Sequence, residues 1–486
     1  MGRSMAREGL VPKYPIVLLP GLASSSLQVE EGNPEWVGEW IWLSLAKIGS
    51  QKFKTLFSSP TVSKRIDPDA SDEGSADAQF RNEWVRHVCL QQDGCSDPPG
   101  IRVRPVPGKD GCAYLSPGAL TNNLSYVMGP LIENLHEFGY TDSDLVAVPY
   151  DWRLPPHMLE ERDGFFTQLR TIIEKTAERC QSPVVIVAHS MGNRVLQYFL
   201  HRLVVTEGDL GRQWIDRHVH SYVAVGAPFL GAPKIVRSLA TGERMGMEAL
   251  LRQEEGVAFI RSLGSTGMIM PMAQPRYFEV PREFVHLRGE RSEAHLPITI
   301  TQTLALAGAS KQVENLEAYY RRNSVWGRMP DAPPVKRLFA IYGVNLDTEM
   351  FYFYRRDRKG ELVFDRDVKD TADFQGYTMR EGIGYETKDT VQGTLRSSTG
   401  LHGHRSGDGT VPYVSLNYCT EWRQDLELRI EELEGVEHRE ILNNRLFFRL
   451  LIEHVSEPLT LRQRRERETV VLGCIDDERD DTDVDA

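Results

Sequence analysis

Short apolar runs alternate with amphipathic stretches along most of this 486-residue chain. The apolar runs have the length of buried strands and lie at residues 14–20, 145–148, 184–188, 220–225 and 337–342. In residues 120–138, 160–180 and 440–454, apolar side chains recur at helical spacing, which predicts helices with one buried face. Strands that alternate with helices in this way predict an α/β fold with a doubly wound, mostly parallel sheet.

Two segments depart from this alternation and predict insertions. Residues 36–80 begin with tryptophans and then become strongly polar. Residues 231–335 are rich in proline and in methionine, a side chain that adapts to irregular apolar ligands but also simply fills gaps. We therefore expect a core of residues 12–35, 81–230 and 336–458, a lid or membrane-contact insertion at 36–80, a cap insertion at 231–335, and a charged, disordered tail at 459–486.

The tryptophans at the start of the first insertion allow two interpretations. Trp36, Trp40 and Trp42 could form the aromatic face of a lid that meets lipid and substrate. A helix packed in the core explains the same side chains equally well, because large aromatic side chains dominate protein interiors. The sequence leaves both interpretations open.

Ser190 is a candidate nucleophile because it directly follows the strand predicted at 184–188. In the nucleophile elbow, a serine is held on a strained turn between a strand and a helix, and its neighbours must be small. Ala188 takes the place of the first glycine of that motif, and Gly192 supplies the second. A plain turn would have the same local pattern, so the interpretation depends on partners elsewhere in the chain.

An acid and a histidine follow Ser190 in the order that α/β-hydrolases use. Asp408 lies between two glycines in a loop, and His438 directly precedes the last predicted helix. We predict that His438 takes the Ser190 proton as general base, while Asp408 fixes the tautomer of the imidazole. Two alternatives stay open: Asp408 could be an ordinary turn residue, and His454 could be the histidine, although its helical position predicts that it faces solvent.

Acyl transfer also requires donors for an oxyanion. The backbone N–H groups of Met191, directly after the serine, and of Leu22, after the first strand, are predicted to form the oxyanion hole. His402, His404 and Asp408 could be taken for a metal site, but no second cluster of ligands accompanies them. We therefore expect neither a metal nor another cofactor.

Charge and composition narrow the possible partners and compartments. A net charge of -12, about half of it in residues 476–485, argues against a nucleic-acid partner, which would need clustered Lys and Arg. No apolar run approaches the roughly 20 residues of a membrane-spanning helix, and no secretory signal is seen at the N-terminus. The six cysteines are too sparse for a disulfide framework. We expect a cytoplasmic or peripheral membrane protein.

Several motifs occur in a shared order along nearly the whole chain. They are Leu19-Pro-Gly-Leu22, Tyr114-Leu115, Pro149-Tyr-Asp-Trp-Arg153, His189-Ser-Met-Gly-Asn193, Gly226-Ala-Pro-Phe-Leu-Gly231, Leu338-Phe-Ala-Ile-Tyr-Gly343, Gly407-Asp-Gly-Thr-Val-Pro412 and His438. In these motifs the chain resembles the lecithin:cholesterol acyltransferase family, especially its phospholipid:diacylglycerol acyltransferase and plant phospholipase branch. The resemblance implies an α/β-hydrolase fold with lid and cap insertions and a triad of Ser190, Asp408 and His438.

The same resemblance implies acyl transfer from a phospholipid donor at a lipid surface. The donor would acylate Ser190, and a sterol, a diacylglycerol or water would accept the acyl group. The region from Trp36 to Trp42 would then be the lid. The chain departs from the family in having no cysteine between residues 20 and 88, so that the lid disulfide of secreted members cannot form. An N-terminal transmembrane helix of the diacylglycerol acyltransferase type is also not seen.

Three functions fit these residues. The first is a lipid O-acyltransferase, and the second is a phospholipase A, in which water accepts the acyl group from the same acyl-enzyme. The third is a lipid-binding scaffold on an inactive hydrolase fold. The presence of all three triad residues argues against the scaffold, which needs none of them.

Overall fold

The central sheet consists of six parallel strands in a computed structural model that describes residues 1–42, 44, 83–116, 125–242, 253–272, 284–289, 295–322, 324–374, 376–389 and 405–458. In spatial order the strands are β17 (Glu427–Glu434), β11 (Arg337–Val344), β8 (Val219–Val225), β7 (Val184–His189), β2 (Ile16–Leu19) and β6 (Leu145–Ala147). Every neighbouring pair is parallel, which confirms the predicted sheet. The edge strand β17 was not predicted, because its residues are mostly charged.

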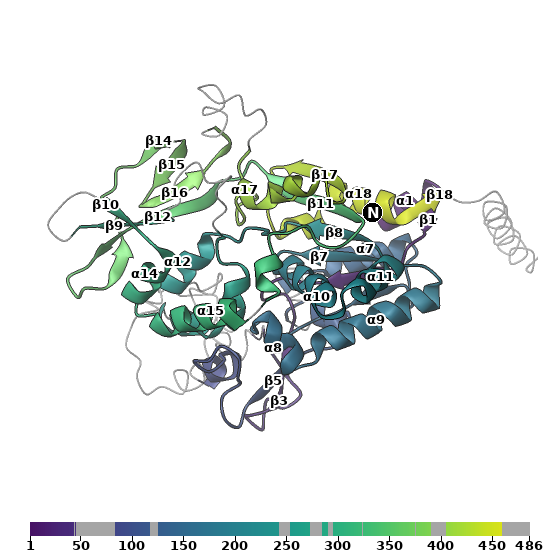
Figure 1. The fold of residues 1–486 in the computed structure, drawn as a ribbon, viewed down its shortest axis with the longest axis horizontal. Helices are drawn as coiled ribbons and strands as arrows, with labels where there is room; N and C mark the ends of the chain where they lie inside the picture. Colours follow the sequence, from purple (N-terminus) through teal and green to yellow (C-terminus); the bar gives the residue numbers. More distant parts are fainter. Residues whose placement is uncertain are drawn as a thin grey trace, which may run out of the picture.

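Each face of this sheet packs against its own layer of helices (Figure 1). Successive strand residues point to opposite faces, so that Val17 belongs to one apolar cluster and Ile16 to the other. The helices on the Val17 face are α9 (Phe165–Cys180), α10 (Met191–Glu207) and α11 (Asp209–His218). Those on the Ile16 face are α1 (Gly2–Arg7), α7 (Gly129–Phe138) and α18 (Arg445–Val455). The sheet is therefore doubly wound, as predicted.

Three helix boundaries differ from the prediction. The helix expected at 160–180 is divided into α8 (Pro156–Glu161) and α9, with Gly164 in a left-handed conformation between them. The helix expected at 440–454 is also divided, because the side chain of Asn444 accepts the first N–H groups of α18 and separates it from the 3-10 helix η4 (Glu440–Asn443). Helix α7 begins at Gly129, and residues 117–124 lie outside the described part.

A second sheet lies to one side of the central sheet (Figure 1). Its strands are β9 (Val285–Arg288), β10 (His295–Ile298), β12 (Thr348–Arg356), β13 (Leu362–Phe364), β14 (Thr371–Phe374), β15 (Tyr377–Arg380) and β16 (Ile383–Glu386). This corrects the expected domain division, which assigned all of 336–458 to the core. The chain leaves the central sheet after β11 at Asn345, which has a φ of 67°, and then enters the second sheet as β12.

Residues 231–335 supply helices as well as two strands of this sheet. The helices are α12 (Lys234–Thr241), α13 (Gln253–Ser262), α14 (Ile300–Leu306) and α15 (Ser310–Arg322), with the 3-10 helices η1 (Gly264–Met268) and η2 (Trp326–Arg328). Helix α12 contacts β12, so that residues 231–335 meet the segment that leaves the central sheet after β11. Shorter elements elsewhere are α5 (Asp110–Ala113), α17 (Tyr413–Leu416), η3 (Asn417–Trp422) and the pair β1 (Leu10–Pro12) and β18 (Ser456–Pro458). Within the described ranges, no helix has the length and apolar character that crossing a membrane requires.

The tryptophans of the predicted lid lie at a small third sheet of β3 (Leu27–Glu31), β4 (Trp40–Trp42) and β5 (Arg102–Pro105). Trp42 is buried against Trp84, Trp152 and Phe259, with ring centroids 5.0 to 6.2 Å away. Trp36 is buried as well, whereas Trp40 is half-buried.

The lipid-facing arrangement expected for Trp36 and Trp42 is therefore absent from this structure, because both side chains pack in the core. Their burial matches the alternative interpretation. Neither residue is on a helix, however, because Trp42 ends the strand β4 and Trp36 lies in a turn before it. The rest of the predicted lid, at 45–80, lies outside the described residues.

The Asp151-Trp-Arg153 part of the sequence motif forms a buried ion network. The Arg153 side chain is fully buried and bonds the carboxylates of Asp151 at 2.7 Å and Asp97 at 2.9 Å. Arg162 adds a second contact to Asp151. Burial alone would raise the pKa of Asp151, but the two guanidinium groups outweigh it and hold this pKa well below its usual range. The motif thus joins the loop at Asp97 to the segment after β6.

Candidate active site

Ser190 sits in a strained turn between β7 and α10. Its φ is 51°, an uncommon value for a residue with a side chain. The chain around it has no spare space: a Cβ on Gly21 would lie 2.9 Å from the Ser190 Cβ, and one on Gly192 would collide with the carbonyl oxygen of Pro20. These contacts explain why small residues flank the serine, and they match the geometry of a nucleophile elbow.

The structure brings Ser190, His438 and Asp408 together in one hydrogen-bonded chain. Nε2 of His438 lies 2.8 Å from Oγ of Ser190, and Nδ1 lies 2.7 Å from Oδ2 of Asp408. His438 follows β17 and Asp408 follows the second sheet, so that three separate segments converge at the carboxyl ends of the central strands. This arrangement has the geometry of a serine nucleophile, its base and the acid that orients the base.

Hydrogen bonds and charge prepare Ser190, His438 and Asp408 for proton transfer. Oδ1 of Asp408 accepts the backbone N–H groups of Thr410 and Val411, which leaves Oδ2 for His438. Burial lowers the pKa of His438, but the negative charge of Asp408 and its hydrogen bond outweigh burial, so that the pKa is raised overall. The imidazolium that forms when His438 takes a proton is therefore stabilised.

His189 supports the triad histidine, a role that the sequence analysis missed. Its Nε2 lies 3.0 Å from the backbone oxygen of His438. Burial, followed by the charge of His438, lowers the pKa of His189 to about 3, so the ring is neutral near pH 7 and donates from Nε2 to this oxygen. The only sequence signal is its place directly before Ser190.

The two predicted oxyanion donors belong to two segments that meet at the serine. Met191 is the first residue of α10, so its N–H has no acceptor within the helix. Leu22 follows Gly21, the residue whose backbone lies against Ser190. The loop turns back at Ala23, which has a φ of 55°. Both residues are thus next to the candidate nucleophile, and their role as donors stays a prediction.

His454 lies apart from the hydrogen bonds that join Ser190, His438 and Asp408. Nε2 of His454 is 2.8 Å from Oγ of Ser221, and burial lowers the pKa of His454 to about 4. The expectation that it faces solvent is wrong, because α18 packs this half-buried side chain against β8 and β11. His402 and His404 lie outside the described residues. In the part of the chain that is described, no three His, Cys, Asp or Glu side chains are placed to hold a metal ion.

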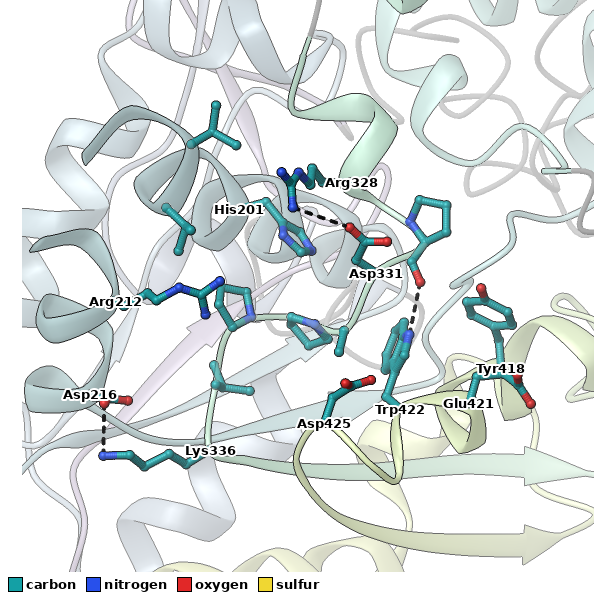
Figure 2. A pocket seen from close by; sticks show the side chains of 17 residues that line it. His201, Arg212, Asp216, Arg328, Asp331, Lys336, Tyr418, Glu421, Trp422 and Asp425 are labelled. Carbon is teal, nitrogen blue, oxygen red and sulfur yellow. Dashed lines mark hydrogen bonds and ion pairs between the residues drawn. The ribbon is translucent and has the colours of Figure 1, made fainter. Parts of the chain in front are cut away.

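A cavity of about 800 Å³ lies beside the C-terminal half of α10 (Figure 2). Figure 2 shows an ion pair and a hydrogen bond between residues that line it. Lys336 pairs with Asp216 at 3.2 Å, and Trp422 donates to the Pro330 oxygen. None of the triad residues lines this cavity. It is therefore separate from the point where Ser190 and His438 meet.

Comparisons with known proteins relate this chain to lipid acyltransferases. The family model described as lecithin:cholesterol acyltransferase matches residues 77–279 and 291–445, more than half of the chain. The chain is 28% identical to a phospholipid–sterol O-acyltransferase of Arabidopsis thaliana, over 70% of this chain and 62% of that protein. It is 24% identical to a phospholipid:diacylglycerol acyltransferase of Saccharomyces cerevisiae, over 87% of this chain and 64% of that protein.

A third relative is a lysosomal phospholipase A and acyltransferase of Mus musculus, 27% identical over 77% of this chain and 78% of that protein. The chain spans less than two thirds of the length of the Arabidopsis thaliana and Saccharomyces cerevisiae relatives. Because the family model covers most of the chain, including Ser190, Asp408 and His438, this protein belongs to the lecithin:cholesterol acyltransferase family.

Proposed function

We propose that this chain is a serine-dependent lipid O-acyltransferase, which moves an acyl group from a glycerophospholipid through an acyl-enzyme on Ser190 to an alcohol. The observation that carries the proposal is the hydrogen-bonded chain from Ser190 through His438 to Asp408. Family membership supports the lipid substrate, because the relatives are named as phospholipid acyltransferases.

In the first half-reaction, Oγ of Ser190 attacks the ester carbonyl of the donor while Nε2 of His438 takes its proton. The oxygen of the tetrahedral intermediate gains a negative charge, which the N–H groups of Leu22 and Met191 would stabilise. When the intermediate collapses, His438 returns the proton to the leaving oxygen. A lysophospholipid departs, and the acyl group stays on Ser190 as an ester.

In the second half-reaction, His438 takes a proton from the acceptor, which attacks the acyl-enzyme. A sterol or a diacylglycerol gives a new lipid ester, and Ser190 regains its proton. Donor and acceptor both reside in lipid surfaces, so we expect peripheral contact with a membrane. The same residues serve both steps, and the acceptor alone determines the product.

A phospholipase A activity, with water as the acceptor, is the second candidate. It is supported by the mouse relative, whose name combines phospholipase A with acyltransferase. A scaffold without activity fits less well, because it would not need a serine, a histidine and an acid within hydrogen-bond distance of one another.

The test is product analysis with acyl-labelled phosphatidylcholine, with and without a sterol or a diacylglycerol. A labelled lipid ester that requires the added alcohol supports the transferase, and labelled free fatty acid alone supports the phospholipase. Ser190→Ala should abolish both products, whereas Ser143→Ala, which changes an exposed serine, should leave them unchanged. Products that persist in Ser190→Ala would contradict the acyl-enzyme mechanism.

A further inference from the structure

The loop that carries Asp408 is bound to a buried acid of the second sheet. Glu386 is the last residue of β16, and its side chain is almost completely buried. Its Oε1 accepts the backbone N–H of Gly407 at 2.6 Å and that of Tyr413 at 2.7 Å. One carboxyl oxygen therefore holds the loop both before and after Asp408.

A second side chain of the same sheet holds the loop between these points. Thr348 is the first residue of β12, is fully buried and lies opposite Glu386 in the strand register. Its Oγ1 accepts the N–H of Gly409 at 2.9 Å. Neighbouring strands thus supply the acceptors for the residues on both sides of Asp408.

These acceptors determine where the Asp408 carboxylate can lie. The N–H groups of Gly407 and Tyr413 are buried, so water cannot replace a lost partner there, and the loop must move to satisfy them. The N–H of Gly409 is half-buried. Such a movement would displace Oδ2 of Asp408 from Nδ1 of His438, a contact of 2.7 Å. The second sheet therefore determines where Asp408 lies relative to His438.

We propose that Glu386 and Thr348 are positioning residues for Asp408, through which the second sheet sets the geometry of the triad. This inference rests on the proposed function, because it assigns a role within the same Ser190 chemistry. Neither side chain touches the reacting atoms, and both act only through the loop.

The charge state of Glu386 suits this role. Burial raises its pKa to about 8, the N–H groups of Tyr413 and Gly407 oppose this rise, and the charge of Asp408 adds to it. Near pH 7, Glu386 is mostly a neutral acid that accepts through Oε1 without placing a second negative charge beside Asp408. The titratable groups that face it are Asp408 and Tyr377. A glutamine is therefore its functional equivalent.

Two matched pairs of variants of the full chain test the proposal: Glu386→Gln against Glu386→Leu, and Thr348→Ser against Thr348→Val. The readouts are kcat and KM for phosphatidylcholine and the rate at which a fluorophosphonate labels Ser190, each measured across pH. We expect the Gln and Ser variants to stay within about twofold of wild type. Because a misplacement of about 1 Å costs roughly a hundredfold in rate, we expect Glu386→Leu to lose about that factor in kcat with KM unchanged. Thr348→Val, which releases only one N–H, should lose about tenfold.

The pH profile separates positioning from a general loss of structure. Asp408 raises the pKa of His438, so a displaced Asp408 lets this pKa fall, and the acidic limb of the labelling rate moves to lower pH. The other groups that face His438 are Glu437, Lys234 and His189, and none of the four variants changes them. A smaller amount of folded protein would lower the rate without moving the limb.

Glu349→Leu is the control, because it removes a 2.8 Å ion pair with Arg237 and the hydrogen bond that Tyr352 donates within the same sheet. Among the described residues, Glu349 has no hydrogen bond or ion pair with the loop that carries Asp408. It should keep the wild-type rate and pH profile. The proposal is overturned if Glu386→Leu and Thr348→Val label as fast as wild type, or if their rates fall without a shift of the acidic limb. Equal labelling of wild type and Ser190→Ala would instead refute the proposed function, so that the two failures are distinguishable.

Discussion

Replacing Gly226 by alanine tests whether the triad needs the space that this glycine leaves beside the imidazole. Gly226 directly follows β8 and has a φ of 53°. An alanine Cβ at this position would lie 3.2 Å from both Cε1 and Nδ1 of His438, and 3.5 Å from Oδ2 of Asp408. The substitution therefore acts on the contact between His438 and Asp408 without removing a polar group.

The substitution should have two effects: the backbone conformation lowers the free energy of unfolding, and the steric contact lowers kcat. A residue with a Cβ in the left-handed region costs about 1–2 kcal/mol of folding free energy. The imidazole must also move by a few tenths of an ångström before the new contact reaches an ordinary van der Waals distance. Because a misplacement of about 1 Å costs roughly a hundredfold in rate, a shift of this size should lower kcat by about three- to tenfold.

Gly308→Ala is the matched control. Gly308 has a φ of 74°, and nothing lies within 4 Å of the Cβ that alanine would add. Steady-state rates with labelled phosphatidylcholine and urea unfolding measure the two effects separately. Both variants should lose a similar free energy of unfolding, and only Gly226→Ala should lose kcat. The reasoning fails if Gly226→Ala keeps the wild-type kcat, or if Gly308→Ala loses as much.

Three further substitutions test the triad, the ion network and the tryptophans. Asp408→Asn should lower kcat by about 10⁴-fold and, because Asp408 raises the pKa of His438, should move the acidic limb of the pH–rate profile to lower pH; an unmoved limb would contradict the assignment. Asp151→Ala leaves the buried Arg153 short of a partner and should cost about 3–5 kcal/mol in urea unfolding. Because the folded-state pKa of Asp151 lies below its usual range, this contribution is present at neutral pH and disappears on acidification, so wild type and variant should converge at low pH. Trp42→Ala should lower the free energy of unfolding by about 3–5 kcal/mol, and a near-neutral result would favour a lid over core packing.

Local sequence indicated the elbow, and the order of residues along the chain indicated its partners. The strand, the strained serine and the helix that follows it are adjacent in the chain, so apolar periodicity and small flanking residues identify all three. Asp408 and His438 could be found because their order after Ser190 is restricted, and each stands in a loop next to a predicted element. The doubly wound sheet follows from the same alternation of buried strands and one-sided helices.

The tertiary structure decided what depends on contacts between distant segments. The strands of the second sheet come from two separate parts of the chain, so no local period shows that 348–386 leaves the core. Trp36 and Trp42 could face lipid or the interior on sequence alone, and only the neighbours Trp84, Trp152 and Phe259 place Trp42 inside. Glu386 carries no sequence signal of a role beside Asp408, because its function lies in two backbone N–H groups that folding brings to it. Periodicity reports which side of an element is buried, but only the packed chain determines which side chains meet there.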